Sequence, residues 1–119
     1  MQTYKELTVW KQSVVLVKEV YVLASALSKD EKYGLVSQMR RAAVSIPANI
    51  AEGYARKHRL EYVQFLRISF GSGAELETYL TIIKEIGIMD KGRIATAERV
   101  LDGVMRMLNK LIASLDPKP

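Results

Sequence analysis

Apolar residues recur at alternating spacings of three and four positions in four stretches of the chain. This spacing places apolar side chains on one face of an α-helix, whereas a half-buried strand needs strict alternation. The expected helices span residues 8–28, 34–55, 59–87 and 91–115. The joints between them are short, and short joints make consecutive helices antiparallel neighbours. The pattern therefore predicts an all-α, up-down-up-down four-helix bundle, formed by a single domain over residues 1–119.

Each expected helix carries one apolar stripe that supplies the core. The stripes are Trp10, Val14, Val17, Tyr21, Ala24 and Leu27 or Ser28; Leu35, Met39, Ala42, Ile46, Asn49 or Ile50, and Gly53; Tyr62, Leu66, Ser69, Gly73, Leu76, Leu80 and Ile83; and Ile94, Ala97, Leu101, Val104, Leu108, Leu111 and Leu115. Trp10 and Tyr21 are accordingly expected to pack in the core rather than to stack on a ligand.

Pro47 interrupts the second stripe. Its ring removes a backbone donor and clashes with the carbonyl four residues back, which predicts a kink near residues 43–47. The alternative is a helix break, with Pro47 as the first residue of a new segment. Asn49 is expected to satisfy carbonyl groups that Pro47 leaves without a donor.

Two glycines interrupt the third stripe, at Gly71 and Gly73, and each costs about 1 kcal/mol in a helix relative to Ala. Ser72 and Glu75 between and after them offer a capping box, as at a helix start. The apolar stripe nevertheless keeps its phase through this point. A continuous helix is therefore favoured, whose small residues admit a neighbouring helix at close range.

The first helix is apolar well beyond its core stripe, over about five positions in seven where about three are usual. The fourth helix carries additional apolar positions as well. Because monomers rarely expose apolar patches that large, the pattern predicts a homo-oligomer. The expected interface residues are Val9, Val15, Leu16, Val22, Leu23, Met105 and Ile112.

Lysine and arginine exceed aspartate and glutamate by 18 to 13, which gives a net charge of +5. Residues 1–60 hold the whole excess, because residues 61–119 are balanced. A basic imbalance indicates a polyanionic partner, although it also serves solubility. The candidate nucleic-acid-binding residues are Arg40, Arg41, Arg56, Lys57 and Arg59. The alternative role of the arginine pair is to form ion pairs with Glu52, Glu75 or Glu77.

The composition excludes several kinds of chemistry. The chain has no cysteine and a single histidine, His58, so disulfides, thiolate metal sites and thiol nucleophiles are ruled out. Glu75 and Glu77 lie on different helix faces and cannot form an acid–base pair by themselves. No cofactor, metal or catalytic role is therefore expected. The chain start lacks an apolar leader, and residues 14–27 are interrupted by charge and too short to span a bilayer, so we expect a cytoplasmic protein.

Several segments together resemble a known family. Residues 33–53 read YGLVSQMRRAAVSIPANIAEG, residues 7–11 read LTVWK, residues 61–66 read EYVQFL and residues 71–77 read GSGAELE. The chain resembles, over roughly residues 7–89, the bacterial four-helix-bundle proteins encoded in intervening sequences of 23S ribosomal RNA genes. Its last helix resembles them in pattern alone.

The resemblance implies a ring, most typically a homopentamer. It also implies kinship to the accessory variability determinant of diversity-generating retroelements, which has a basic surface and binds nucleic acid and a reverse transcriptase. The turn before the third helix departs from the family pattern, because it reads Arg56-Lys57-His58-Arg59 where the family usually offers a Ser or Thr cap. This departure makes the turn more basic.

Two functional hypotheses follow. The first is a non-enzymatic, oligomeric scaffold whose Lys and Arg side chains, gathered on one face, bind RNA or DNA backbone without strong sequence specificity. Repetition around a ring would multiply weak phosphate contacts into avidity. The second is a protein–protein interaction module that docks a polymerase-like or other protein, with its charge serving complementarity.

Overall fold

The computed structural model describes residues 3–116, without the side chains of Lys32 and Tyr33. Within that range the chain forms four α-helices and no strand. The helices are α1 (Thr8–Ser25), α2 (Ser37–Ala55), α3 (Arg59–Ile86) and α4 (Lys91–Leu115). Their bounds lie within three residues of the predicted ones. A 3₁₀ turn (Lys29–Glu31) and a π-helical turn (Lys32–Val36) connect α1 to α2.

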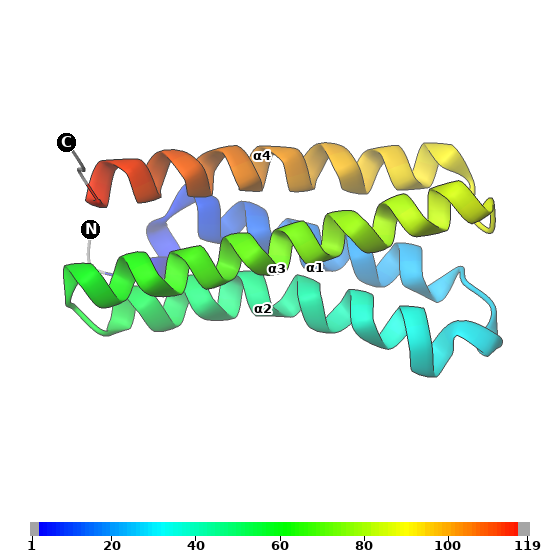
Figure 1. Cartoon of the computed structure of the whole chain (residues 1–119), viewed down its shortest axis with the longest axis horizontal. Helices are drawn as coiled ribbons and strands as arrows, with labels where there is room; N and C mark the ends of the chain where they lie inside the picture. The colour runs from blue at the N-terminus through cyan, green and yellow to red at the C-terminus, as the bar shows by residue number, and fades with distance from the viewer. Residues whose placement is uncertain (1–2, 117–119) are drawn as a thin grey trace.

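Figure 1 shows how the helices share one long direction, each one returning alongside its predecessor. The molecule measures 44 × 25 × 20 Å, so its sides are long and its ends small. The start of α1, the turn between α2 and α3 and the end of α4 lie at one end (left in Figure 1). The α1–α2 connection and the α3–α4 turn lie at the other. Segments distant in sequence therefore meet at each end of the bundle.

The predicted core stripes of α2, α3 and α4 are confirmed. The buried positions on these stripes are Met39, Ala42, Ile46, Ile50 and Gly53 in α2; Leu66, Ser69, Gly73, Leu76, Leu80 and Ile83 in α3; and Ile94, Ala97, Leu101, Val104 and Leu108 in α4. Helical periodicity identified the inner face of these helices because each carries polar residues around the rest of its circumference.

The predicted stripe of α1 is wrong except at Ala24, which is buried. Its buried face consists of Val9, Ser13, Leu16, Val20, Leu23 and Ala24. The predicted positions Trp10, Val14 and Val17 are half-buried, and Tyr21 is 44% exposed. The reason is the serine: the Ser13 hydroxyl donates a 2.7 Å hydrogen bond to the Trp10 carbonyl oxygen. Because its hydrogen bond is made within the helix, the Ser13 side chain can occupy the core without a desolvation penalty.

Because a different face of α1 is buried than the sequence predicted, part of the predicted oligomer interface is wrong as well. Val9, Leu16 and Leu23 are covered by helices of their own chain, and so is Ile112. Placing these four residues in an interface between copies was therefore wrong. Met105 is half-buried against the core. Val15 and Val22 are exposed, as an interface would require.

Helix α2 runs without interruption through Pro47, so the alternative of a break is wrong. The Asn49 side-chain amide donates to the Ser45 carbonyl oxygen (2.8 Å) and hydroxyl oxygen (2.9 Å). The carbonyl that Pro47 deprives of a donor belongs to Ala43, four residues before it. The expectation that Asn49 would serve that carbonyl is therefore wrong, and its amide instead holds Ser45 in place.

Helix α3 is also continuous, through Gly71 and Gly73, so the capping-box interpretation is wrong. Small residues do admit close neighbours, as predicted. The Ser45 and Ser72 hydroxyl oxygens lie 2.8 Å apart, and the Ser69 hydroxyl donates a 2.9 Å hydrogen bond to the Ile46 carbonyl oxygen. These bonds join α2 to α3 near the middle of both helices.

Candidate nucleic-acid interface

The five candidate cationic residues do not lie together. Arg40 and Arg41 are near the start of α2, whereas Arg56, Lys57 and Arg59 surround its end. Sixteen residues at 1.5 Å per residue separate Arg40 from Arg56 by about 24 Å along the helix. The five residues therefore form two separate groups, one toward each end of the bundle, and each group is a separate candidate.

Within the described residues, the arginine pair has no ion-pair partner. No carboxylate of the described residues lies within 4 Å of Arg40 or Arg41, so the predicted intrasubunit ion pairs are absent there. The Arg40 guanidinium lies over the ring of Tyr21, with Cζ 4.8 Å from the ring centroid, and its Nε is buried with no partner among the described residues. Arg41 lines a small hollow together with Glu75.

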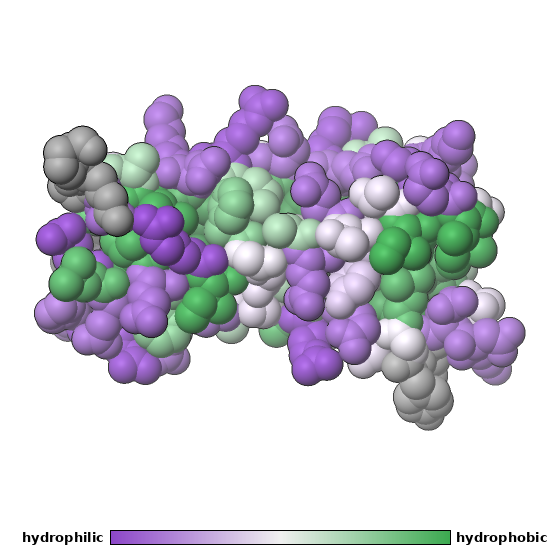
Figure 2. All heavy atoms as spheres, in the orientation of Figure 1, coloured by the Kyte–Doolittle hydropathy of each residue, from purple (hydrophilic) through white to green (hydrophobic). Residues whose placement is uncertain are grey.

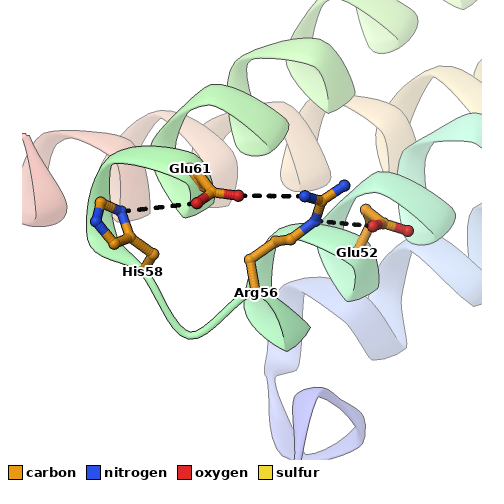
Figure 3. A network of polar contacts seen from close by, with 4 residues as sticks. All are labelled: Glu52, Arg56, His58 and Glu61. Carbon is orange, nitrogen blue, oxygen red and sulfur yellow. Dashed lines mark hydrogen bonds and ion pairs between the residues drawn. The ribbon is translucent and has the colours of Figure 1, made fainter.

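Arg56 is charge-balanced by two glutamates (Figure 3). Its Nε lies 3.0 Å from Glu52 Oε2, and its Nη1 lies 3.3 Å from Glu61 Oε1. The guanidinium also covers the ring of Phe65, 5.0 Å from the centroid. His58 Nδ1 approaches the other Glu61 oxygen at 4.0 Å. Two carboxylates around one guanidinium cancel its charge locally, so Arg56 organises the turn and offers less uncompensated positive charge than Lys57 or Arg59.

Lys57 and Arg59 have no carboxylate within 4 Å among the described residues. Lys57 has a left-handed backbone (φ 56°) just beyond Arg56, the C-cap of α2, and helices commonly end in this conformation at that position. Its amide donates to the Tyr54 carbonyl oxygen at 3.2 Å. Arg59 Nη1 donates a 2.7 Å hydrogen bond to the carbonyl oxygen of Leu115 at the end of α4.

These two cations line a pocket of about 480 Å³ at the α2–α3 end of the bundle. The lining residues are Gly53, Tyr54, Lys57, His58, Arg59, Tyr62 and Leu115. None of them is acidic. Tyr54 and Tyr62 lie within three residues of the basic run in the sequence, but the sequence gives no signal that Leu115, at the end of the last helix, closes the same pocket.

The two tyrosines form an edge-to-face pair, with ring centroids 5.7 Å apart and planes at 89°. The Tyr62 hydroxyl is buried and has no hydrogen-bond partner among the described residues. Burial, with a smaller effect from Tyr54, raises the pKa of Tyr62 to about 12. The hydroxyl therefore stays protonated at neutral pH and is available as a hydrogen-bond donor.

Residues 3–116 contain no group of three His, Asp or Glu side chains arranged to hold a metal ion. In the same range, no helix is both long enough and apolar enough to cross a membrane. The remaining groups at the α2–α3 end offer cations, tyrosine rings and an unpaired hydroxyl. That set suits binding of an anionic, partly aromatic ligand.

The model of the family of 23S rRNA-intervening sequence proteins matches residues 5–110. The chain belongs to that family. A crystal structure of a protein of unknown function from the S23 ribosomal protein family of Bacteroides thetaiotaomicron VPI-5482 is also similar, with a TM-score of 0.82 and 20% sequence identity. The similarity covers 88% of this chain and 98% of that one, and it shows a shared fold. No curated protein matches the chain.

This 23S rRNA-intervening sequence protein leaves apolar side chains uncovered on α1. Val15 is 38% exposed and Val22 is 59% exposed. They are seven residues apart and so lie on the same helix face. Lys11 and Lys18 are exposed on that face too, which gives α1 an outer line that alternates lysine and valine.

Proposed function

We propose that the protein is a non-enzymatic, oligomeric scaffold that binds the backbone of RNA or DNA without strong sequence specificity. The observation that carries this proposal is the pairing of Lys57 and Arg59 around a pocket with no acidic residue among its described lining residues. Cations without carboxylate partners are available to replace the counterions of a phosphate backbone. Membership of a family named for its place in ribosomal RNA genes is consistent with this partner class.

Assembly is the second part of the proposal. Val15 and Val22 remain exposed in the single chain, and a neighbouring copy would cover them. In a closed ring, such as the homopentamer that the family resemblance implies, the α2–α3 ends of all copies lie on the same face of the ring. The two cations of each copy are then repeated around that face. A nucleic-acid strand that spans several copies makes several weak phosphate contacts at once, and its overall affinity for the ring increases.

A salt series of binding measurements tests the proposal. Affinity for a short RNA or DNA is expected to fall steeply from about 50 to about 200 mM salt, because binding releases counterions. Lys57→Gly should weaken binding, since glycine adopts the left-handed backbone of this position and the fold is retained. Arg93→Gln, an exposed cation at the other end of the bundle, is the matched control and should leave binding unchanged. No binding at low salt would refute the proposal.

A protein-docking function is the second candidate, and one observation favours it. Ile82, Ile86 and Ile88 are exposed where α3 ends, and Figure 2 shows hydrophobic surface at that end of the molecule (right). A partner protein that covers these side chains would be recovered in a pull-down that is insensitive to nuclease. Ile86→Asp should abolish that recovery and leave nucleic-acid binding intact.

A further inference from the structure

The pocket at the α2–α3 end combines two chemistries that a bare phosphate backbone does not require together. Lys57, His58 and Arg59 supply basic groups, whereas Tyr54, Tyr62 and Leu115 supply aromatic and aliphatic surface. At about 480 Å³, the pocket falls within the range of small-molecule sites in proteins. A ligand that uses both parts carries an anionic group and a planar apolar group.

We propose that this pocket binds one unpaired nucleotide, with its base against Tyr54, Tyr62 and Leu115 and its phosphate at Lys57 and Arg59. This inference rests on the proposed function and specifies it, because it assigns the site to a strand end or an unstacked nucleotide rather than to duplex backbone. Bases in single strands are commonly held against aromatic side chains in this way, whatever their sequence.

The unpartnered Tyr62 hydroxyl supports the assignment. A buried hydroxyl without a partner is costly, and native structures rarely keep one without a reason. Tyr62 lines the pocket, and its hydroxyl remains protonated at neutral pH. Its hydroxyl is covered by protein atoms, so it donates a hydrogen bond to a base or sugar oxygen of the bound nucleotide only once the Tyr62 side chain turns toward the pocket.

Arg59 is held in position before any ligand arrives. One of its N–H groups donates to the Leu115 carbonyl oxygen, which fixes the guanidinium at the pocket wall between α3 and α4. A guanidinium has five N–H donors, so others are left for phosphate oxygens. A cation that is already ordered loses less side-chain entropy on binding than a freely moving one.

Calorimetric titration with adenosine monophosphate, adenosine and inorganic phosphate tests the proposal on the intact protein. Adenosine monophosphate should bind at least about tenfold more tightly than either fragment, because it alone engages both halves of the pocket. Lys57→Gly should weaken its binding by about tenfold, which is the usual loss for a charge-assisted contact. Tyr62→Phe should weaken it as well, without loss of stability, and Arg93→Gln should change nothing.

A competition experiment separates this inference from the proposed function. Adenosine monophosphate is expected to displace a labelled single-stranded oligonucleotide, and that result supports both. If the oligonucleotide binds but the mononucleotide neither binds nor competes, the pocket assignment is refuted and the backbone-binding function stands. If the mononucleotide binds but no oligonucleotide does, the pocket is a nucleotide site and the proposed function fails.

Discussion

The guanidinium of Arg59, the first residue of α3, donates a 2.7 Å hydrogen bond to the carbonyl oxygen of Leu115, the last residue of α4. The two residues are 56 positions apart in the chain. A cation at the C-terminus of a helix satisfies a carbonyl without an intrahelical partner and interacts favourably with the helix dipole. Arg67 and Asp116 add a second link beside it, with Nη2 and Oδ2 2.6 Å apart. The basic end of the bundle is thus braced by α4.

Replacing Arg59 should therefore cost stability as well as ligand binding. Arg59→Gln is expected to lower the free energy of unfolding by about 1 kcal/mol, because it removes a charged cap from α4. Urea denaturation followed by circular dichroism measures the change. Arg93→Gln, at the opposite end and with no carboxylate within 4 Å among the described residues, is the control. Equal stability of the two variants would show that the Arg59–Leu115 bond contributes nothing.

Because α3 lies close to α2 at Gly53 but leaves open space at Gly71, replacing these two glycines by alanine should have opposite effects on stability. A Cβ atom at Gly53 would lie 2.7 Å from Phe65 Cβ and 3.2 Å from the Tyr62 carbonyl oxygen, whereas one at Gly71 would meet nothing within 4 Å. Gly53→Ala should destabilise the protein by about 1–3 kcal/mol through overpacking. Gly71→Ala should stabilise it by up to about 1 kcal/mol through helix propensity. Thermal melting of both variants checks the signs, and destabilisation by Gly71→Ala would contradict the open space there.

The glutamates around Arg56 should restrain nucleic-acid binding. Glu52→Gln removes one of the two carboxylates that balance Arg56, so the guanidinium becomes available to phosphate. The variant should bind RNA more tightly at low salt, and the slope of log affinity against log salt should steepen by about one. Stability should change by less than about 1 kcal/mol, because the pair is exposed. Glu85→Gln, near the far end of α3, is the charge-matched control, and an equal gain there would point to net charge alone.

Tyr62 predicts a loss of stability at alkaline pH. Burial raises its pKa from 10.0 to about 12 in the folded protein. Between these values the unfolded chain releases the phenolic proton while the folded chain keeps it, so stability falls as pH rises through this window and is unaffected below it. The loss of folding stability is expected to be modest, because the Tyr62 ring is only half-buried.

Denaturation at about pH 9 and about pH 11 measures this effect, and Tyr62→Phe should reduce the difference between them. At neutral pH the same variant should be as stable as the parent or more stable, since it removes an unpaired buried hydroxyl. A variant that loses stability at neutral pH would mean that the hydroxyl has a hydrogen-bond partner after all.

Sequence periodicity predicted three of the four inner faces because α2, α3 and α4 each mix an apolar stripe with polar positions. It failed for α1 because that helix is apolar almost all round, so more than one rotation satisfies the pattern. Ser13 caused the wrong choice of face: it lies on the face that is buried, and its polar side chain made that face look less apolar than the neighbouring one. A hydroxyl bonded to its own helix carries no signal in the sequence.

The candidate site was predictable only in part for a related reason. The run from Arg56 to Arg59 marks a basic turn, but sequence spacing cannot show that Glu52 and Glu61 balance Arg56. Nor can it show that the end of α4 closes the pocket beside Arg59. These contacts depend on how far each helix extends along the bundle, which is set by packing rather than by local sequence.

The most direct test of the account is the mass of the protein by light scattering, alone and with a short single-stranded RNA at low salt. The account predicts a stable multiple of the 13.4 kDa chain whose mass increases on addition of RNA. Val15→Lys combined with Val22→Lys should reduce it to folded single chains that bind RNA weakly. A wild-type protein that stays at 13.4 kDa at micromolar concentration and takes up no RNA would contradict it.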